Sequence, residues 1–494
     1  MSNYRRPGVY VEEITTFPPS VAAVETALPA FIGYTVKRPE RPLLAGMDPT
    51  TAEEDRPPQP IRIGSLLEFE ELFGRGRPPA INEVLLDENL QFVSADLSQD
   101  FYLYPAVQLF YANGGGDCFI VSVGELLVDT TTPQSGDFTQ GLDALATWDE
   151  PTILLFPDAV SLTGGTHPIY ALQDAALKQC QDLKDRVAIL DLPEDDTDGA
   201  DFRDNTGTVG LSYGAAYTPW LVTSLPKPID ANVLDDAGAV FKIGAGGTAQ
   251  DLSATLIAEE QPLLTAVTGA TTPQAVADAE LTLYQQSSTY RSILRGLNNA
   301  QINVPPSGAV AGLYAMVDRT RGVWKAPANV SVTAADGLTE VFSQSELGDL
   351  NVDVTAGKSI NAIRQFTGRG ILVYGARTLA GNDGEYRYVS VRRLMNMLEE
   401  SIQKATAQFV FEPNDANTWT RVRAMIENFL TLLWRDGALQ GAKQEHAFRV
   451  AIGLGQTMTP QDVVDGRMIV TIAVAPVRPA EFIILKFMQH LPTS

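Results

Sequence analysis

The sequence has few of the residues that build disulfide scaffolds and metal sites. Its 494 residues include two cysteines, Cys118 and Cys180, and neither lies in a CxxC pair. Two cysteines form at most one disulfide, and we expect both to be buried free thiols in a reducing compartment. The three histidines, His167, His446 and His490, form no HxxxH or HxH pattern. We therefore expect neither a dedicated metal site nor a cofactor.

Long apolar runs are also absent. The longest candidates, Met468–Val474 and Phe482–Leu485, fall well short of the roughly 20 residues that cross a bilayer. Arg5 and Arg6 are followed by no apolar stretch, so we expect no secretory signal. These observations predict a chain that folds in the cytoplasm and does not insert into membranes.

Positive charge is scarce relative to negative charge. The chain has 36 lysines and arginines against 60 aspartates and glutamates, a formal net charge of -24. Because an acidic surface repels phosphate, direct nucleic-acid binding is not expected. Acidic residues concentrate at Glu53–Asp55 and Glu194–Asp204, whereas the region after Gly370 is closer to balance and contains many arginines. The balanced region is the better candidate for a surface that faces a partner.

Motifs for nucleotide binding and catalysis are incomplete. Gly357-Lys358-Ser359 resembles the end of a phosphate-binding loop, but Val352 stands at the position of the first glycine. Gly114–Gly116 precede an apolar run instead of opening a helix, which favours a tight turn over dinucleotide binding. A Ser-His-Asp triad would need His167, a local aspartate and a distant serine, but we expect no GxSxG elbow and no serine in a glycine-flanked turn before a helix. Asp318–Asn329 is dense in charge and could form a ligand loop, but we favour a packed crossover in which Arg319 and Arg321 bind carbonyls or carboxylates.

The chain is too long for one ordinary core, and its patterns predict a multidomain protein of α/β and α+β regions. We expect residues 1–25 to form an extended arm and 26–100 a small β-rich domain. Residues 101–370 are expected to form an α/β domain with an insertion at about 228–300, and 371–494 an α+β domain.

Apolar runs in the α/β region predict a parallel sheet. Cys118–Val123, Thr152–Phe156 and Val187–Leu190 have the length and composition of buried strands, and Ile169–Leu183 has helical spacing. Strand, helix and strand in this order predict a βαβ unit.

The last region has clearer periodicity, with helices separated by turn residues and followed by strands. The elements expected there are, in order, a strand at Ile371–Tyr374, helices at Val389–Phe409 and Asp415–Arg435, and strands at Ala447–Ile452, Met468–Val474 and Glu481–Phe487.

The two ends of the chain each carry a predicted strand that has no hairpin partner nearby in sequence. Unpaired strand groups must find hydrogen bonds elsewhere, which favours arms donated to neighbouring subunits and hence a polymer. The candidate arm residues are Val9, Tyr10, Val11, Glu12, Phe482, Ile484 and Lys486.

The residues resemble contractile tail sheath proteins along most of the chain and in the same order. The matching segments are Pro7–Glu13, Pro29–Gly33, Asp185–Asp191, Tyr217–Trp220, Pro306–Gly312 leading into Arg319–Asn329, Gly375–Thr378, Tyr388–Leu394, Phe411–Asn414 and Pro476–Phe482. The resemblance implies a subtilisin-like α/β domain without catalytic residues, a C-terminal α+β sheath domain, and N- and C-terminal β arms that complete a neighbour's sheet.

The same resemblance implies a structural, non-enzymatic subunit of a contractile sheath, part of a phage tail or contractile injection particle assembled in the bacterial cytoplasm. The sheath would surround an inner tube and shorten on triggering to drive the tube through a target envelope. Implied partners are neighbouring sheath subunits in stacked hexamers, the tube protein, and baseplate and terminator or cap proteins. Arg421 and Arg423 become candidates for facing the tube. The alternatives are a subtilisin-like hydrolase and a non-contractile scaffold polymer.

Overall fold

The computed structural model describes residues 21–42, 47–48, 50–53, 56–126, 131–164, 168–235, 240–244 and 246–486. The chain divides into two compact units. The larger unit comprises Glu25–Asn396 and the chain from Arg478 onward, and the smaller unit comprises Met397–Val477 with the chain up to Val24. No helix in the described ranges combines the length and the apolar content needed to cross a bilayer.

A nine-stranded sheet forms the centre of the larger unit, in the order β12-β15-β14-β8-β7-β6-β1-β5-β2. The inner strands run parallel, from β14 through to β5, and antiparallel strands flank them at both ends. The strands are β1 (Pro29–Thr35), β2 (Pro60–Ile63), β5 (Cys118–Glu125), β6 (Ile153–Leu155), β7 (Val187–Asp191), β8 (Gly214–Thr218), β12 (Val330–Ser331), β14 (Ile360–Phe366) and β15 (Gly370–Val373). The predicted parallel sheet is confirmed, and so is the βαβ unit, because β6 and β7 are parallel neighbours joined through α4.

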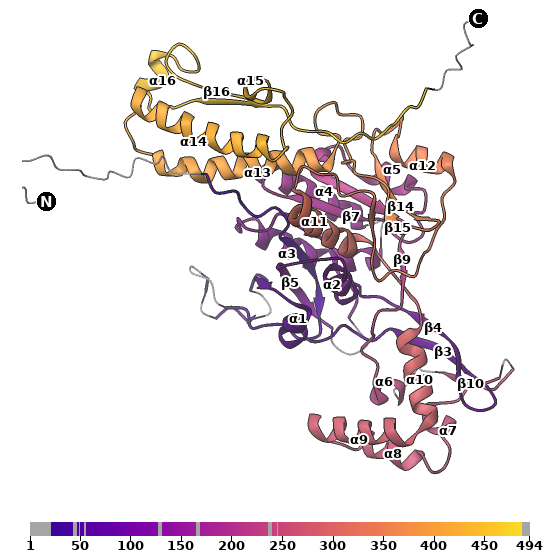
Figure 1. Ribbon diagram of the computed structural model, residues 1–494. Coiled ribbons are helices and arrows are strands. Elements are labelled where there is room, and N and C mark those ends of the chain that lie inside the picture. Colours follow the sequence, from indigo (N-terminus) through magenta and orange to yellow (C-terminus); the bar gives the residue numbers. More distant parts are fainter. Residues whose placement is uncertain are drawn as a thin grey trace, which may run out of the picture. The chain divides into compact units, whose positions relative to one another are not determined.

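Helices cover both faces of this sheet (Figure 1). Phe31 of β1 shares one apolar core with α2 and α11, whereas the next residue, Ile32, shares the other core with α3 and α4. Successive strand residues point to opposite faces, so a strand buried on both sides reads as a continuous apolar run. The helices around the sheet are α1 (Leu66–Phe73), α2 (Leu103–Ala112), α3 (Ser135–Leu145), α4 (Pro168–Leu183), α5 (Ala200–Asn205), α11 (Ser307–Arg321) and α12 (Gln344–Asn351).

Helices α2 and α11 approach each other closely because glycines lie between their backbones. A Cβ atom on Gly308 would lie 2.3 Å from the carbonyl oxygen of Ala106, and one on Gly312 would lie 2.4 Å from that of Phe110. The predicted turn at Gly114–Gly116 is also confirmed, since Gly114 has φ +92° and the Gly115 amide donates to the Phe110 carbonyl at 2.9 Å. These contacts fix the two helices on one face of the sheet.

Asp158, in the turn after β6, ties the end of β1 to the start of α2. Its carboxylate accepts backbone hydrogen bonds from Tyr34 (2.8 Å), Tyr102 (2.5 Å) and Leu103 (2.7 Å). Burial raises the pKa of Asp158 to about 6, although the three hydrogen bonds act in the opposite direction.

The pH dependence of stability should carry the signature of Asp158. The folded state holds its proton up to about pH 6, whereas the unfolded chain releases it near the ordinary 3.8, so stability falls as pH rises between these values. In denaturant titrations, the free energy of unfolding of the wild type relative to Asp158→Asn is expected to fall by about 2 kcal/mol between pH 4 and pH 7. A constant difference across that range would contradict the assignment.

A separate apolar core within the larger unit joins the expected insertion to a hairpin from earlier in the chain. Strands β3 (Ala80–Leu86) and β4 (Phe92–Ser98) form a sheet with β10 (Phe241–Ile243). Buried side chains of this sheet, such as Val84, pack with those of the insertion, such as Leu283. The insertion's helices are α6 (Ala231–Asp235), α7 (Leu252–Thr255), α8 (Gln261–Thr268), α9 (Pro273–Gln286) and α10 (Ser288–Asn299).

This arrangement differs from the small β-rich domain expected over residues 26–100. Strands β1 and β2 belong to the nine-stranded sheet, and β3 and β4 pair with the insertion. The sequence pattern could not reveal this because strand partners are chosen over long sequence separations.

A further small sheet contains β11 (Ile302–Val304), β9 (Leu221–Thr223) and β13 (Gly337–Leu338), in that order.

The smaller unit begins within α13 (Val389–Thr406), not at residue 371 as expected. Strand β15 pairs with β14 and β12, so the chain from Gly370 to Asn396 stays with the larger unit. The predicted helices are confirmed as α13 and α14 (Ala416–Arg435). The remaining elements are α15 (Gln444–Ala447), β16 (Phe448–Ile452), α16 (Pro460–Val464) and β17 (Val470–Val474).

The strand expected at Glu481–Phe487 is not formed in the single chain. The described part, Glu481 to Lys486, has no regular secondary structure and pairs with no strand of the described residues. The N-terminal candidates Val9, Tyr10, Val11 and Glu12 lie outside the described residues, as do His167 and His490.

Candidate assembly surfaces

The C-terminal segment exposes four consecutive apolar side chains. Phe482, Ile483, Ile484 and Leu485 have 69%, 80%, 79% and 72% of their surface accessible, respectively. Contiguous exposed apolar residues are typical of interaction sites, because burial against a partner removes their apolar surface from water. The segment contains Phe482, Ile484 and Lys486, the C-terminal candidates from the sequence.

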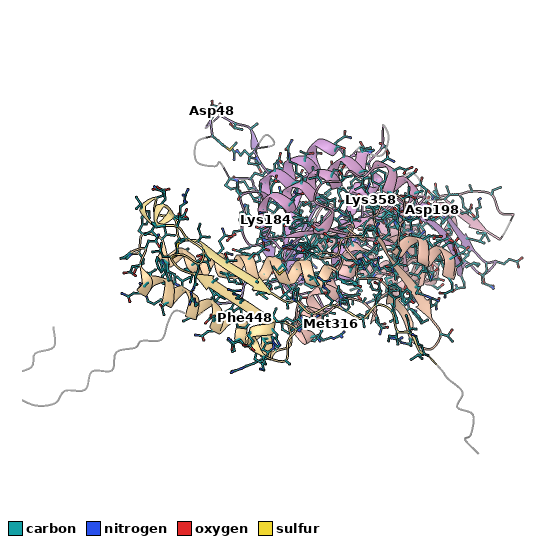
Figure 2. All side chains as sticks on the ribbon, turned by 90° about the horizontal axis from the view of Figure 1, so that it is seen from above. Asp48, Lys184, Asp198, Met316, Lys358 and Phe448 are labelled. Carbon is teal, nitrogen blue, oxygen red and sulfur yellow. The ribbon has the colours of Figure 1, made fainter. Side chains whose placement is uncertain are left out.

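Strands β16 and β17 form a two-stranded antiparallel sheet, with Phe448 opposite Val474 and Ile452 opposite Val470. Among the described residues, no third strand joins this sheet. Its outer edges therefore present unpaired backbone groups that can bind another strand. Phe448, at the start of β16 (Figure 2), also borders an open hollow of about 630 Å³. The hollow is lined by Glu427, Lys443, Gln444, Glu445, Phe448, Arg449 and Val450.

The two arginines proposed to face a tube differ in their surroundings. Arg421 is half exposed, pairs with Glu412 at 2.8 Å, and lies over the ring of Phe409. Arg423 is partly buried and donates to the carbonyl of Ile452 at 2.5 Å, at the end of β16. Arg421 is therefore free to contact a partner after breaking a surface ion pair, whereas Arg423 holds α14 to the sheet.

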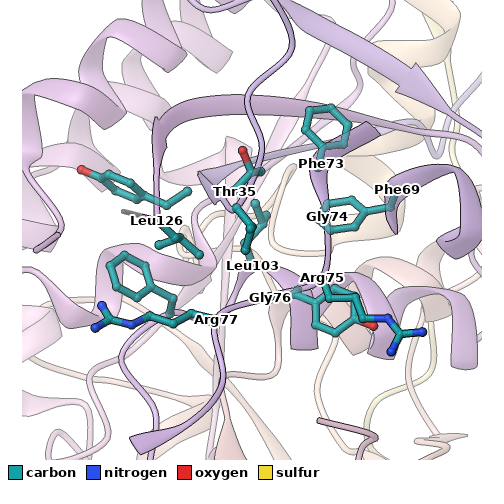
Figure 3. Close-up of a pocket in the computed structure, with 13 residues that line it drawn as sticks. Thr35, Phe69, Phe73, Gly74, Arg75, Gly76, Arg77, Leu103 and Leu126 are labelled. Carbon is teal, nitrogen blue, oxygen red and sulfur yellow. The ribbon is translucent and has the colours of Figure 1, made fainter. Parts of the chain in front are cut away.

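The interior features do not build a ligand site. The pocket shown in Figure 3, between α1 and the end of β1, has a volume of about 10 Å³, room for about one water molecule. Lys358 of the phosphate-loop-like sequence is buried, and its Nζ donates to the carbonyls of Arg203 (2.6 Å) and Thr206. Burial lowers the pKa of Lys358. No group of three or more metal-ligating side chains gathers within the described ranges.

The residues considered for catalysis have structural surroundings. Cys118 and Cys180 are free and buried, as predicted, and burial raises the pKa of the Cys118 thiol to about 12. Gly210–Gly214 matches the letters of the GxSxG pattern, although we expected no such elbow. However, Ser212 lies in a short 3-10 turn that precedes β8, whereas a nucleophile elbow follows a strand and opens a helix. Arg319 binds the carbonyl of Gly114 at 3.2 Å, as expected of that charged segment.

One cluster of polar residues could not be predicted from the sequence. Glu481 lies at the base of the exposed C-terminal segment, where Arg377 binds its carboxylate. The two residues are 104 positions apart, and no local pattern connects them. The signal available from the sequence was that Arg377 and Glu481 each lie in a segment that resembles sheath proteins, Gly375–Thr378 and Pro476–Phe482.

Comparisons with known proteins point to tail sheath proteins. Residues 382–489 match the family described as the phage tail sheath C-terminal domain. The chain is 29% identical over 185 residues to the tail sheath protein of Vibrio phage KVP40, and 26% identical over 184 residues to that of Enterobacteria phage T4. These alignments cover 37% of this chain and only 26% and 27% of the two relatives, about a quarter of their length.

Solved structures extend the similarity to the whole chain. The sheath complex of the extracellular contractile injection system PVC in its contracted state is 28% identical, with a TM-score of 0.61 over 99% of both chains. The contracted helical sheath of the anti-feeding prophage is 27% identical, with a TM-score of 0.60 over 99% of this chain and 100% of that one. The C-terminal region of this chain therefore matches the phage tail sheath C-terminal domain, and the whole chain is similar to subunits of contracted sheaths.

Proposed function

We propose that this chain is the structural subunit of a contractile sheath and has no enzymatic activity. The observation that carries the proposal is the combination, in one chain, of an exposed apolar segment and a two-stranded sheet with open edges. The segment would supply an additional strand, and the open edge of the sheet would supply the backbone groups with which that strand pairs. The α/β region would be the subtilisin-like scaffold that the family resemblance implies, used here to present these surfaces.

The segment Phe482–Lys486 would add a strand to the β16–β17 sheet of a neighbouring subunit. Its five residues match the length of β16 and β17, which have 5 residues each. Phe482 and Ile484 would share one face of the added strand, so both could pack on the apolar side of the sheet while the backbone completes the ladder. The N-terminal residues Val9, Tyr10, Val11 and Glu12 would occupy the other edge.

A lattice linked in this way can shorten without coming apart, because the arms keep neighbours connected while subunits repack. The free energy would come from new contacts between subunits and not from a nucleotide. The other partners would be an inner tube protein, a baseplate, and a terminator or cap, in a phage tail or contractile injection particle assembled in the bacterial cytoplasm.

Negative-stain electron microscopy of the purified chain tests the proposal. Striated hollow tubes, formed alone or after co-expression with the neighbouring tube protein, are the expected result. Monodisperse subunits under both conditions would contradict it. A polymer with one lattice state under all conditions would favour the non-contractile scaffold, and labelling by a serine-reactive probe would favour the hydrolase.

Arg421→Glu is expected to weaken assembly on the tube while leaving the fold intact. The substitution reverses a half-exposed charge and removes a surface ion pair, which contributes about 0–1 kcal/mol to stability. Co-sedimentation of sheath with purified tubes measures the effect, and we expect at least a tenfold lower bound fraction. Arg435→Glu, on the last turn of the same helix, is the matched control. Unchanged binding by the Arg421 variant would remove this face from the tube interface. Arg423 is unsuitable for the test because its reversal would disrupt the contact with Ile452.

A further inference from the structure

Glu481 is held by four hydrogen bonds at the point where the exposed C-terminal segment begins. Arg377 donates from Nε to Oε1 at 2.8 Å and from Nη2 to Oε2 at 2.7 Å. Asn351 Nδ2 donates to Oε1 at 2.6 Å, and the Tyr388 hydroxyl donates to Oε2 at 2.9 Å. A bidentate arginine pair with two further donors fixes both the position and the orientation of the carboxylate.

Arg377 is shielded from solvent, whereas the side chain of Glu481 is 20% exposed. The side chain of Arg377 is 4% exposed and also donates to the carbonyls of Asn351 and Gly381. Burial raises the pKa of Glu481, but the hydrogen bonds from Arg377, Asn351 and Tyr388 outweigh it and leave the pKa below its ordinary value. The side chain of the next residue, Phe482, is largely open to solvent. The anchored part of the chain therefore ends at Glu481.

A second buried arginine, Arg393, holds the chain at Thr26, close to the predicted N-terminal arm. Arg393 Nη1 and Nη2 bind the two carboxylate oxygens of Asp318 at 3.0 and 2.6 Å, and the side chains are 3% and 7% exposed. Thr26 joins this pair, since its hydroxyl donates to Asp318 Oδ2 at 2.6 Å and its carbonyl accepts from Arg393 Nη2 at 2.8 Å. The guanidinium of Arg393 also lies over the Tyr314 ring, 4.6 Å from its centre.

Both anchors belong to the larger unit, and both use one short stretch of it. Arg377 and Tyr388 precede α13, and Arg393 lies in the first turns of that helix. The division between the units falls at Val24/Glu25 and at Val477/Arg478, within a few residues of Thr26 and Glu481. Residues 377–393 therefore fasten the chain at both places where an arm leaves.

We propose that the Arg377–Glu481 and Arg393–Asp318 pairs are positioning residues that root the two arms on one rigid stretch, residues 377–393. The inference rests on the proposed role of the arms and adds what holds them. Bending takes place beyond Thr26 on one side and beyond Glu481 on the other. Because both roots share one stretch, a movement of α13 carries both connections of a subunit together.

Chymotryptic cleavage of the unassembled full-length chain tests the C-terminal root. The enzyme must bind several extended residues on each side of the cleaved bond, so cleavage after Phe482 requires Glu481 to leave its anchor, whereas cleavage after Leu485 does not. The two side chains are almost equally exposed. The measured quantity is the rate of cleavage after Phe482 divided by the rate of cleavage after Leu485. We expect this ratio to be at least tenfold lower in the full-length chain than in a synthetic peptide of residues 477–488.

The double variant Arg377→Met with Glu481→Met removes the anchor without leaving a buried unpaired charge. Its cleavage ratio is expected to approach that of the equivalent peptide, with the thermal midpoint still cooperative. Lys242→Met with Glu83→Met removes an ion pair of the small β3–β10 sheet and is the matched control, with a wild-type ratio expected. Equal cleavage at both sites in the wild type, or an unchanged ratio in the anchor variant, would overturn the proposal.

Arg393→Met with Asp318→Met tests the N-terminal root by hydrogen exchange. Exchange of peptides covering residues 21–27 is expected to rise at least tenfold, while the Phe482 cleavage ratio stays that of the wild type. Unchanged exchange would overturn this half of the inference. These readouts use unassembled protein and are independent of polymer formation. Failure of the wild type to polymerise would therefore count against the proposed function and not against the anchors.

Discussion

Removal of residues 482–494 is expected to leave a folded, soluble subunit that does not polymerise. The truncation keeps Glu481 and its anchor but deletes the four exposed apolar residues Phe482–Leu485. Burying each of these side chains in a neighbour would contribute about 1.5–3 kcal/mol, so their loss removes most of the driving force for one lattice connection. Sedimentation and electron microscopy measure the polymer, and thermal unfolding of the soluble fraction checks the fold.

A point variant provides the matched control for this truncation. On the proposed added strand, Ile484 and Phe482 would share the face that packs on the apolar side of the sheet. Ile483 would lie on the opposite face. Ile484→Asp and Ile483→Asp change the same chemistry at adjacent positions, and we expect the first to lower the sedimented fraction more. Deletion of residues 1–15 is expected to match the C-terminal truncation. Normal sheaths from either truncated chain would rule out that arm as a required connection.

Phe110→Ala is expected to destabilise the larger unit by about 3–5 kcal/mol. The Phe110 ring is fully buried, meets the ring of Phe31 edge-on at 5.4 Å, and fills the space beside Gly115. It joins α2 to the central sheet, so the cavity left by alanine cannot collapse without moving a helix already fixed by close glycine contacts. Chemical denaturation measures the loss.

An exposed residue of similar size shows whether the effect is specific. Leu281 of α9 is 55% exposed, and Leu281→Ala should change the free energy of unfolding by less than about 0.5 kcal/mol. If Phe110→Ala also changed it by less than 1 kcal/mol, α2 could not be a fixed part of the core.

Local sequence patterns predicted the helices of this chain more reliably than the strand at its C-terminal end. The helices at Ile169–Leu183 and Asp415–Arg435 were predicted to within a residue or two, because their apolar spacing and caps are local properties. The strand at Glu481–Phe487 was not formed, although its composition is equally strand-like. A strand needs a partner, and among the described residues this segment has none.

The sequence by itself determined that the chain lacks the motifs of a nucleotide-binding or metal protein, that it contains a parallel βαβ arrangement, and that it resembles a sheath subunit. These conclusions depend on residue types and short spacings. The tertiary structure alone decided that β1 joins the central sheet, that β3 and β4 share a core with the insertion, and that the smaller unit starts inside α13. It also brought Arg377 to Glu481 and Arg393 to Asp318 and Thr26. Such partners are selected by packing and by the need to pair buried charges, and these act between residues that no sequence interval connects.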